Sequence, residues 1–173
     1  MRKIIPILLV LFYLCNPSFG QSQYEVIPDK DGKKILKGII SQELLTKDTS
    51  YKWYAENIPG YTPNADAIAA LKKNADSIEL ITFIGTWCGD SQFIIPKFYT
   101  LLDASGFSKT KVTLIGVDRT KKTLSHLAEA LNLIDVPTII VMKNGKELGR
   151  VIEYGKYGMF DKELADIINE GKK

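Results

Sequence analysis

The chain has 173 residues, of which 45% are hydrophobic and 25% charged, and its formal net charge at pH 7 is +3. These fractions are ordinary for a globular protein and exclude disordered, collagen-like and coiled-coil chains. The small net charge argues against a nucleic-acid-binding surface. Two cysteines exclude a disulfide-dense scaffold, and one histidine cannot anchor a His-rich metal site.

Residues 1–20 have the pattern of a secretory signal peptide. Arg2 and Lys3 precede an apolar run that ends at Leu14, and small residues close the segment at Gly20. The run is too short to cross a bilayer, since a membrane-spanning helix needs about 20 residues. We therefore predict an exported protein, in the bacterial periplasm or outside the cell, with no membrane span after cleavage. A buried N-terminal helix is the alternative.

Cleavage after Gly20 removes Cys15 and leaves Cys88 as the single thiol. Bacterial lipoproteins resemble one another in having a small residue before the anchored cysteine, whereas Leu14 precedes Cys15 here. Lipid anchoring through Cys15 is therefore disfavoured. Because thiols are normally paired in oxidising compartments, a leftover cysteine in an exported protein is a candidate reactive group.

Residues 21–75 are predicted to form an N-terminal extension that packs on a main domain, residues 76–173. Its first part is polar and basic, and only a short strand at Lys34–Ile39 is expected there. Ser41 begins a helical pattern, and Asn64 is placed to cap the next helix, in which apolar residues recur at helical spacing. The aromatic residues of the extension are expected to pack on the domain rather than form a recognition surface: Trp53, Tyr54 and Tyr61.

The main domain alternates between buried strands and helices. Strands are predicted at 78–84 and 112–117, and helices at 90–104 and 123–131, the first of them with an interior proline. The chain then predicts a β-hairpin of strands 138–142 and 147–152, followed by an amphipathic helix at 159–169. The order β-α-β-α-β-β-α predicts an α/β fold with a mixed β-sheet flanked by helices.

Cys88 lies between a predicted buried strand and a predicted helix, in the segment Trp87-Cys88-Gly89-Asp90-Ser91. Free backbone N–H groups and the positive end of the helix dipole converge at such a junction. Both favour the thiolate, which is the nucleophilic form of cysteine. Asp90 opposes this effect, more weakly if its carboxylate faces water. The alternative is an inert cysteine that fills space in the core.

This segment resembles the active-site motif of thioredoxin-like proteins, which usually reads Trp-Cys-Gly-Pro-Cys. The resemblance continues with Pro96 inside the following helix and with Val136-Pro137 before a strand, and it covers about residues 76–170. It implies a thioredoxin fold with an N-terminal extension. In that family the proline is cis and faces the cysteine, and the neighbouring backbone binds the substrate chain. The resemblance therefore implies a substrate-binding groove at four residues: Trp87, Gly89, Val136 and Pro137.

Two departures from the family pattern concern the same step of the reaction, the release of the substrate from a mixed disulfide. Ser91 stands where the family has its second, resolving cysteine, and Thr82 stands where many members carry a buried acid that deprotonates it. Cys88 can form a mixed disulfide, but the alcohol of Ser91 cannot resolve it. The resemblance then implies monothiol chemistry, with Ser91 and Gly89 stabilising the Cys88 thiolate and the Ser91 hydroxyl hydrogen-bonded to it.

The predicted function is thiol–disulfide exchange through a mixed disulfide at Cys88, either reduction or isomerisation. The predicted partners are protein or peptide thiols and disulfides, or a small-molecule thiol, and no cofactor is expected. Oxidation of Cys88 to a sulfenic acid is a further reaction open to such a thiol. The alternative from another class is a non-catalytic module of the same fold that binds extended peptides or proteins.

Three other sites are rejected. Gly89-Asp90-Ser91 resembles the nucleophile block of a serine esterase family, but the sole histidine, His126, lacks the accompanying Asp-x-x-His acid and is expected in solvent. One His and one mature Cys cannot close a zinc site. The segment that begins at Asp29 starts like a calcium loop, but Ile40 stands where the bidentate acid belongs.

Overall fold

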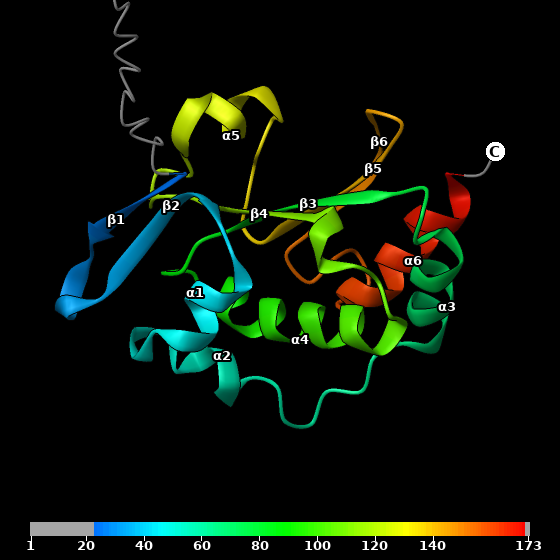
Figure 1. Ribbon diagram of the computed structural model, residues 1–173, viewed down its shortest axis with the longest axis horizontal. Helices are drawn as coiled ribbons and strands as arrows, with labels where there is room; N and C mark the ends of the chain where they lie inside the picture. Colours follow the sequence, from blue (N-terminus) through cyan, green and yellow to red (C-terminus); the bar gives the residue numbers. More distant parts are fainter. Residues whose placement is uncertain (1–22, 172–173) are drawn as a thin grey trace, which may run out of the picture.

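The computed structural model describes residues 23–171 of the chain, so the predicted signal peptide 1–20 and Cys15 lie outside the described residues. The described strands form one sheet in the order β1-β2-β4-β3-β5-β6 (Figure 1). The strands are β1 (Tyr24–Pro28), β2 (Lys34–Ile40), β3 (Glu79–Ile84), β4 (Val112–Gly116), β5 (Thr138–Lys143) and β6 (Lys146–Ile152). β3 and β4 are parallel and the other pairs antiparallel, which confirms the predicted mixed sheet.

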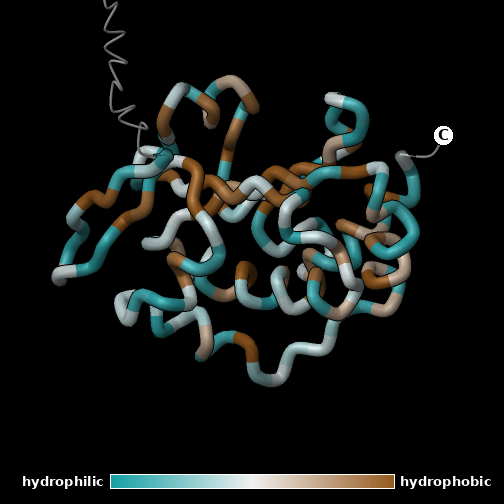
Figure 2. Tube along the Cα trace, in the orientation of Figure 1, coloured by the Kyte–Doolittle hydropathy of each residue, from teal (hydrophilic) through white to brown (hydrophobic). Residues whose placement is uncertain are grey.

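Helices cover both faces of the sheet, also as predicted. They are α1 (Gln42–Lys47), α2 (Trp53–Glu56), α3 (Ala65–Asn74), α4 (Gly89–Ser105), α5 (Leu127–Ala130) and α6 (Phe160–Glu170). Figure 1 shows α5 on one face and the remaining helices on the other. Each face has its own cluster of buried apolar side chains, and Figure 2 shows hydrophobic residues gathered along the sheet.

The strands and helices of the main domain lie close to their predicted positions, with one exception. The helix predicted at 123–131 is instead a 3₁₀ turn, Leu124–His126, followed by the four-residue α5. Ser125 and His126 have positive φ angles of 55° and 54°, which interrupt a regular helix. Leu124 fits the helical spacing, but its side chain packs beside Gly38 of β2 instead. Tertiary packing therefore overrides the local periodicity.

The N-terminal extension contributes two strands to the sheet, where the sequence predicted one. β2 confirms the predicted strand, whereas β1 falls in a segment expected to be an irregular leader. β1 is an edge strand with Val26 exposed, so it lacks the alternation of a half-buried strand. β2 can approach β4 closely because Gly116 has no side chain, which would collide with the carbonyl of Leu36. The predicted division at residue 75 stays a prediction.

An ion pair ties the hairpin of β1 and β2 to the loop after β4. Lys37 Nζ lies 2.8 Å from Asp118 Oδ2, and each side chain is 20% exposed. Asp118 also accepts hydrogen bonds from the Thr120 hydroxyl and from the backbone N–H groups of Thr120 and Lys122. Burial raises the pKa of Asp118, but these donors outweigh it and lower that pKa to about 2.

The aromatic residues of the extension pack on the rest of the protein, as predicted. Tyr54 is 5% exposed, and the Tyr61 ring stacks on Phe160 with centroids 6.0 Å apart. The Tyr61 hydroxyl donates a hydrogen bond of 2.8 Å to the buried carboxylate of Asp161, which also accepts from the backbone N–H of Asn64 at 3.0 Å. Asn64 caps α3, since its side-chain oxygen accepts from two backbone N–H groups of the first turn. Asp161 therefore joins the start of α3 to α6.

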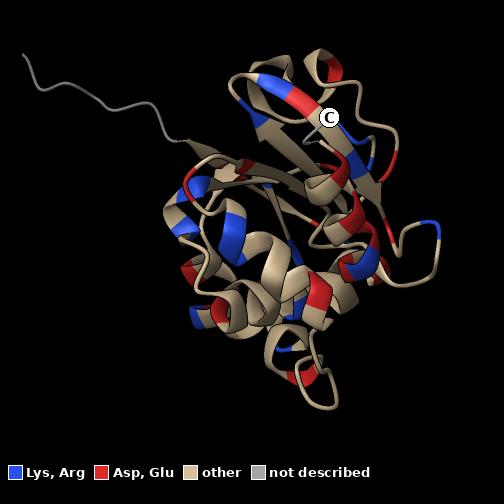
Figure 3. Cartoon of the chain, turned by 90° about the vertical axis from the view of Figure 1, so that its right-hand side faces the viewer, with Lys and Arg blue, Asp and Glu red and all other residues tan. Residues whose placement is uncertain are grey.

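The described surface carries charges of both signs. In the view of Figure 3, acidic and basic residues are interspersed along the chain. Among residues 23–171, no helix is both long enough and apolar enough to cross a membrane.

We predict that Asp161→Ala lowers the free energy of unfolding by about 2–3 kcal/mol, because the Tyr61 hydroxyl and the Asn64 N–H lose a charged acceptor. Asp166→Ala, on the same helix, removes only a partly exposed ion pair with Lys162 and should cost less than about 1 kcal/mol. Urea denaturation measures both values. Equal losses in the two variants would contradict the role given to Asp161.

The lowered pKa of Asp118 predicts a specific pH dependence of stability. The pKa of Asp118 in the folded protein lies below its ordinary value of 3.8, so the folded protein binds fewer protons in this range. The contribution of Asp118 to stability is present above that ordinary value. It is lost as the pH falls towards 2. The difference in unfolding free energy between the wild type and Asp118→Asn should therefore be constant near neutral pH and shrink on acidification. Urea denaturation at several pH values tests this, and a difference independent of pH would contradict it.

Candidate functional site

Cys88 lies where the chain leaves β3 and enters α4, as predicted. It is the N-cap residue of this 17-residue helix, and its carbonyl accepts a hydrogen bond from the N–H of Gln92 at 3.0 Å. The side chain is partly exposed and the thiol is free. The start of a long helix presents unpaired N–H groups and the positive end of its dipole at this position.

The peptide bond between Val136 and Pro137 is cis, which confirms the conformation implied by the family resemblance. The Cys88 thiol donates a hydrogen bond to the carbonyl oxygen of Val136, with sulfur and oxygen 3.1 Å apart. Phe83, near the end of β3, pairs with Thr138, the first residue of β5. The sheet itself therefore brings together two loops: the cysteine loop, residues 85–88 after β3, and the proline loop, residues 134–137 before β5.

Hydrogen bonds hold the proline loop on both sides. The Pro137 carbonyl accepts from the N–H of Glu153 at 2.7 Å, and the Thr138 hydroxyl donates to the Asp135 carbonyl at 2.6 Å. Lys121 Nζ donates to the Ile134 carbonyl at 2.9 Å. The Ile134 side chain nevertheless remains 65% exposed. The loop is thus fixed in place, with an exposed apolar residue two positions before Val136, whose carbonyl contacts the thiol.

Ser91 is fully buried in the first turn of α4, and its hydroxyl oxygen accepts a hydrogen bond from the N–H of Gly85 at 3.1 Å. We expected this hydroxyl to bond the Cys88 sulfur. Among the hydrogen bonds of the described residues, the partner of Cys88 is instead Val136. The expectation fails because the Ser91 hydroxyl instead satisfies the backbone N–H of Gly85, a donor that would otherwise be buried unpaired.

Thr82 is also fully buried, on the same face of β3 as Leu80 and Ile84. Its hydroxyl oxygen has no hydrogen-bond partner within the described part of the chain. The resemblance puts a buried acid at this position, and a hydroxyl cannot take up a proton as a carboxylate does. The region beneath the loop therefore lacks both the second thiol and the ionisable group that would activate it.

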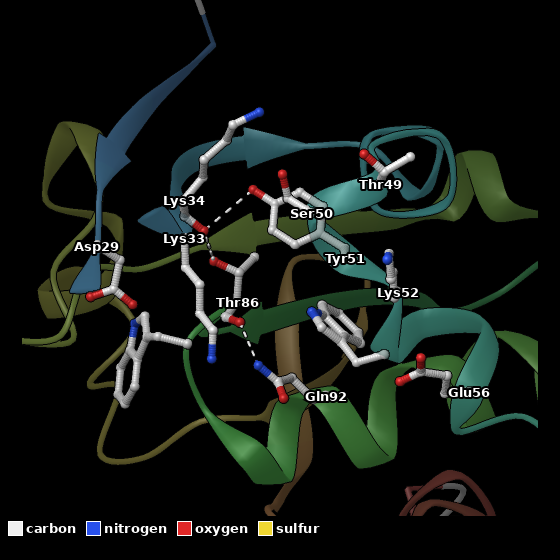
Figure 4. A pocket seen from close by; sticks show the side chains of 12 residues that line it. Asp29, Lys33, Lys34, Thr49, Ser50, Tyr51, Lys52, Glu56, Thr86 and Gln92 are labelled. Atoms are coloured by element: carbon white, nitrogen blue, oxygen red, sulfur yellow. Dashed lines mark hydrogen bonds between the residues drawn. The ribbon is translucent and has the colours of Figure 1, made fainter. Parts of the chain in front are cut away.

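Trp87 and Gly89 flank the cysteine, as the sequence places them. Gly89 is exposed at the first position of α4. Trp87 is half-buried, and its indole Nε1 donates a hydrogen bond of 3.0 Å to the carbonyl of Val117. Trp87 also lines a cavity of about 330 Å³, together with residues of the N-terminal extension. Figure 4 shows this cavity. Lysine side chains lie around this cavity, together with Thr86 and Gln92 of the loop and α4.

Two aromatic residues that the sequence did not single out complete the surface near Cys88. The rings of Phe93 in α4 and Tyr154 after β6 have centroids 5.8 Å apart, and their side chains are 43% and 36% exposed. Burial, and then the nearby Asp90 carboxylate and Cys88, raise the pKa of Tyr154. No local signal marks Tyr154, because the fold of β6 brings it to the site.

The residues considered for the rejected sites lie apart or have other partners. The His126 side chain is 91% exposed, whereas Ser91 is buried, so the two form no catalytic pair. Asp29 pairs with Arg119. Within residues 23–171, no group of three His, Cys, Asp or Glu side chains is placed to bind a metal ion.

The chain is similar to known proteins over more than half of its length. The family model "Thioredoxin" matches residues 64–168. A thioredoxin from Echinococcus granulosus is 32% identical over 96 residues, which are 56% of this chain and 83% of that protein. A thioredoxin from Chlamydia pneumoniae is 30% identical over 97 residues, 56% of this chain and 84% of that one.

A solved structure of Fasciola hepatica thioredoxin is 22% identical, with a TM-score of 0.41, and covers 60% of this chain and 89% of its own. The relatives support a thiol–disulfide oxidoreductase-like function at the level of the family. Because the family model spans more than half of the sequence, the chain belongs to the thioredoxin family and has the thioredoxin fold.

Proposed function

We propose that this chain is an exported thiol–disulfide exchange protein that works with one thiol, Cys88. The observation that carries the proposal is the position of that thiol. It is partly exposed at the start of α4, it contacts the Val136 carbonyl beside the cis proline, and a buried Ser91 stands where a second thiol would be. The proposed substrates are disulfides of proteins or peptides.

In the first step the Cys88 thiolate attacks one sulfur of the substrate disulfide. A new disulfide forms between that sulfur and Cys88, and the other substrate sulfur leaves as a thiolate that takes a proton from water. The helix N-terminus supports the thiolate before attack. Once Cys88 has lost its proton it no longer donates to Val136, so that carbonyl becomes available to a backbone N–H of the substrate.

The exposed apolar side chains around the thiol suit a polypeptide substrate. Ile134 lies on the proline side, and Phe93 and Tyr154 lie on the helix side. Together with Trp87, Gly89, Val136 and Pro137 they border the proposed groove. Exposed apolar groups clustered at a reactive residue are typical of an interaction site.

Resolution of the mixed disulfide needs a thiol from outside the chain. The Ser91 hydroxyl is held by the Gly85 N–H and is a far weaker nucleophile than a thiol. A small-molecule thiol resolves the adduct in a reduction, whereas the second thiol of the substrate resolves it in an isomerisation. Cleavage after Gly20 would remove Cys15 and leave Cys88 as the only cysteine. The proposed location of the cleaved protein is the periplasm or the outside of the cell.

Trapping of the mixed disulfide tests this function. Residues 21–173 are incubated with an oxidised protein or glutathione disulfide, and Cys88 adducts are followed by mass spectrometry. We predict an adduct that persists until a thiol is added. Ser91→Cys should release it unaided, at least about tenfold faster, because the introduced thiol attacks Cys88 internally. Cys88→Ala is the control and should form no adduct.

Two outcomes would contradict the proposal. Lack of any adduct in the wild type is one, and equally rapid unaided release from the wild type and Ser91→Cys is the other. Peptide binding that is unchanged in Cys88→Ala, without exchange in the wild type, would favour the alternative of a non-catalytic binding module.

A further inference from the structure

The indole ring of Trp87 is held on three sides by groups from different parts of the chain. Its Nε1–H donates to the Val117 carbonyl at 3.0 Å. A Cβ atom at Gly85 would lie 2.8 Å from the indole Cε2, so the ring rests directly on the glycine backbone. The guanidinium carbon of Arg119 lies 5.2 Å from the ring centroid, within the range of a cation–π interaction.

Arg119 is in turn held by Asp29 of the N-terminal hairpin. Its Nε and Nη2 donate to the two carboxylate oxygens of Asp29 at 2.8 and 2.9 Å, which makes a bidentate pair. The Asp29 side chain is only 5% exposed, whereas that of Arg119 is 47% exposed. The hydrogen bonds from Arg119 hold the pKa of Asp29 below its ordinary value. The planar fork of Arg119 therefore has one preferred orientation beside the indole.

The hairpin provides a fixed base for this pair. The N–H of Asp29 donates to the Lys33 carbonyl at 2.8 Å, and the neighbouring residues of β1 and β2 are paired in the sheet. The residue before Arg119 is Asp118, which pairs with Lys37 of the same hairpin. Two consecutive residues of the loop after β4 thus form ion pairs with the hairpin. In one pair the loop supplies the anion, Asp118, and in the other it supplies the cation, Arg119. Figure 4 shows Asp29 on the hairpin at one end of the cavity that Trp87 lines.

We propose that Asp29 and Arg119 are positioning residues that hold Trp87 beside Cys88 and thereby favour exchange with bulky disulfide substrates. The kinetic part of this inference rests on the proposed function. A polypeptide in the groove contacts the indole next to Cys88, whereas a small disulfide reaches the thiol without it. The N-terminal hairpin is then part of the active site, although it precedes the region matched by the family model.

Fluorescence quenching tests the positioning without relying on the reaction. Trp53→Phe leaves Trp87 as the single tryptophan. In this background Arg119→Gln should raise the acrylamide quenching constant of Trp87 by about twofold, because the indole ring loses its cation–π contact with the guanidinium. Lys34→Gln is the matched control, because it also removes one positive charge and one hairpin ion pair, that with Asp48 at 3.0 Å. Equal quenching in the two variants would overturn the proposal.

A double-mutant cycle tests whether Arg119 acts through Trp87. We expect Arg119→Gln to lower the rate constant of Cys88 with a disulfide-bonded polypeptide by about two- to fivefold, and that with a small aromatic disulfide by less than twofold. The loss should vanish in a Trp87→Phe background. A loss of the same size in that background would show that Arg119 acts elsewhere.

A wild type that reacts with neither disulfide would overturn the proposed function and the kinetic part of this inference. The quenching comparison would still decide the positioning of Trp87, so the two failures are distinguishable.

Discussion

The antiparallel pairing of β3 with β5 is the constraint on which the candidate site depends. Because Phe83 pairs with Thr138, the chain leaves β3 beside the point where it enters β5. One of these ends continues into the cysteine loop and α4, and the other is preceded by the cis proline. The contact between the Cys88 thiol and the Val136 carbonyl closes the gap between them. The Cys88 sulfur is therefore placed by the sheet, while the helix start supplies the electrostatic environment.

The two substitutions beneath the loop differ in how well they fit the fold. Ser91 is integrated, since it accepts the buried N–H of Gly85. Thr82 contributes a buried hydroxyl without a partner in the described chain, which is a cost to stability. Neither residue ionises near neutral pH, so the backbone around the site is kept while the groups for internal resolution are absent. In the proposed reaction an external thiol therefore has to resolve the mixed disulfide at Cys88.

Local patterns predicted most of the elements and the position of Cys88, because buried strands and amphipathic helices leave a periodic signal. The cis bond at Pro137 followed from family resemblance, since no local feature distinguishes it from a trans bond. β1 and α5 were mispredicted where tertiary contacts decide the structure, as at Leu124 beside Gly38. The pairing of Asp29 with Arg119 joins residues 90 positions apart, and a charge pattern in one sequence does not reveal such a partner.

Alkylation of Cys88 tests most directly the central claim, that the native fold leaves this thiol uncovered and reactive. The rate with iodoacetamide is measured at neutral pH for residues 21–173, folded in buffer and unfolded in urea, with mass spectrometry to count modified chains. The account predicts that the folded protein reacts at least as fast as the unfolded one. A native thiol that reacts only as fast as the protein unfolds would contradict it.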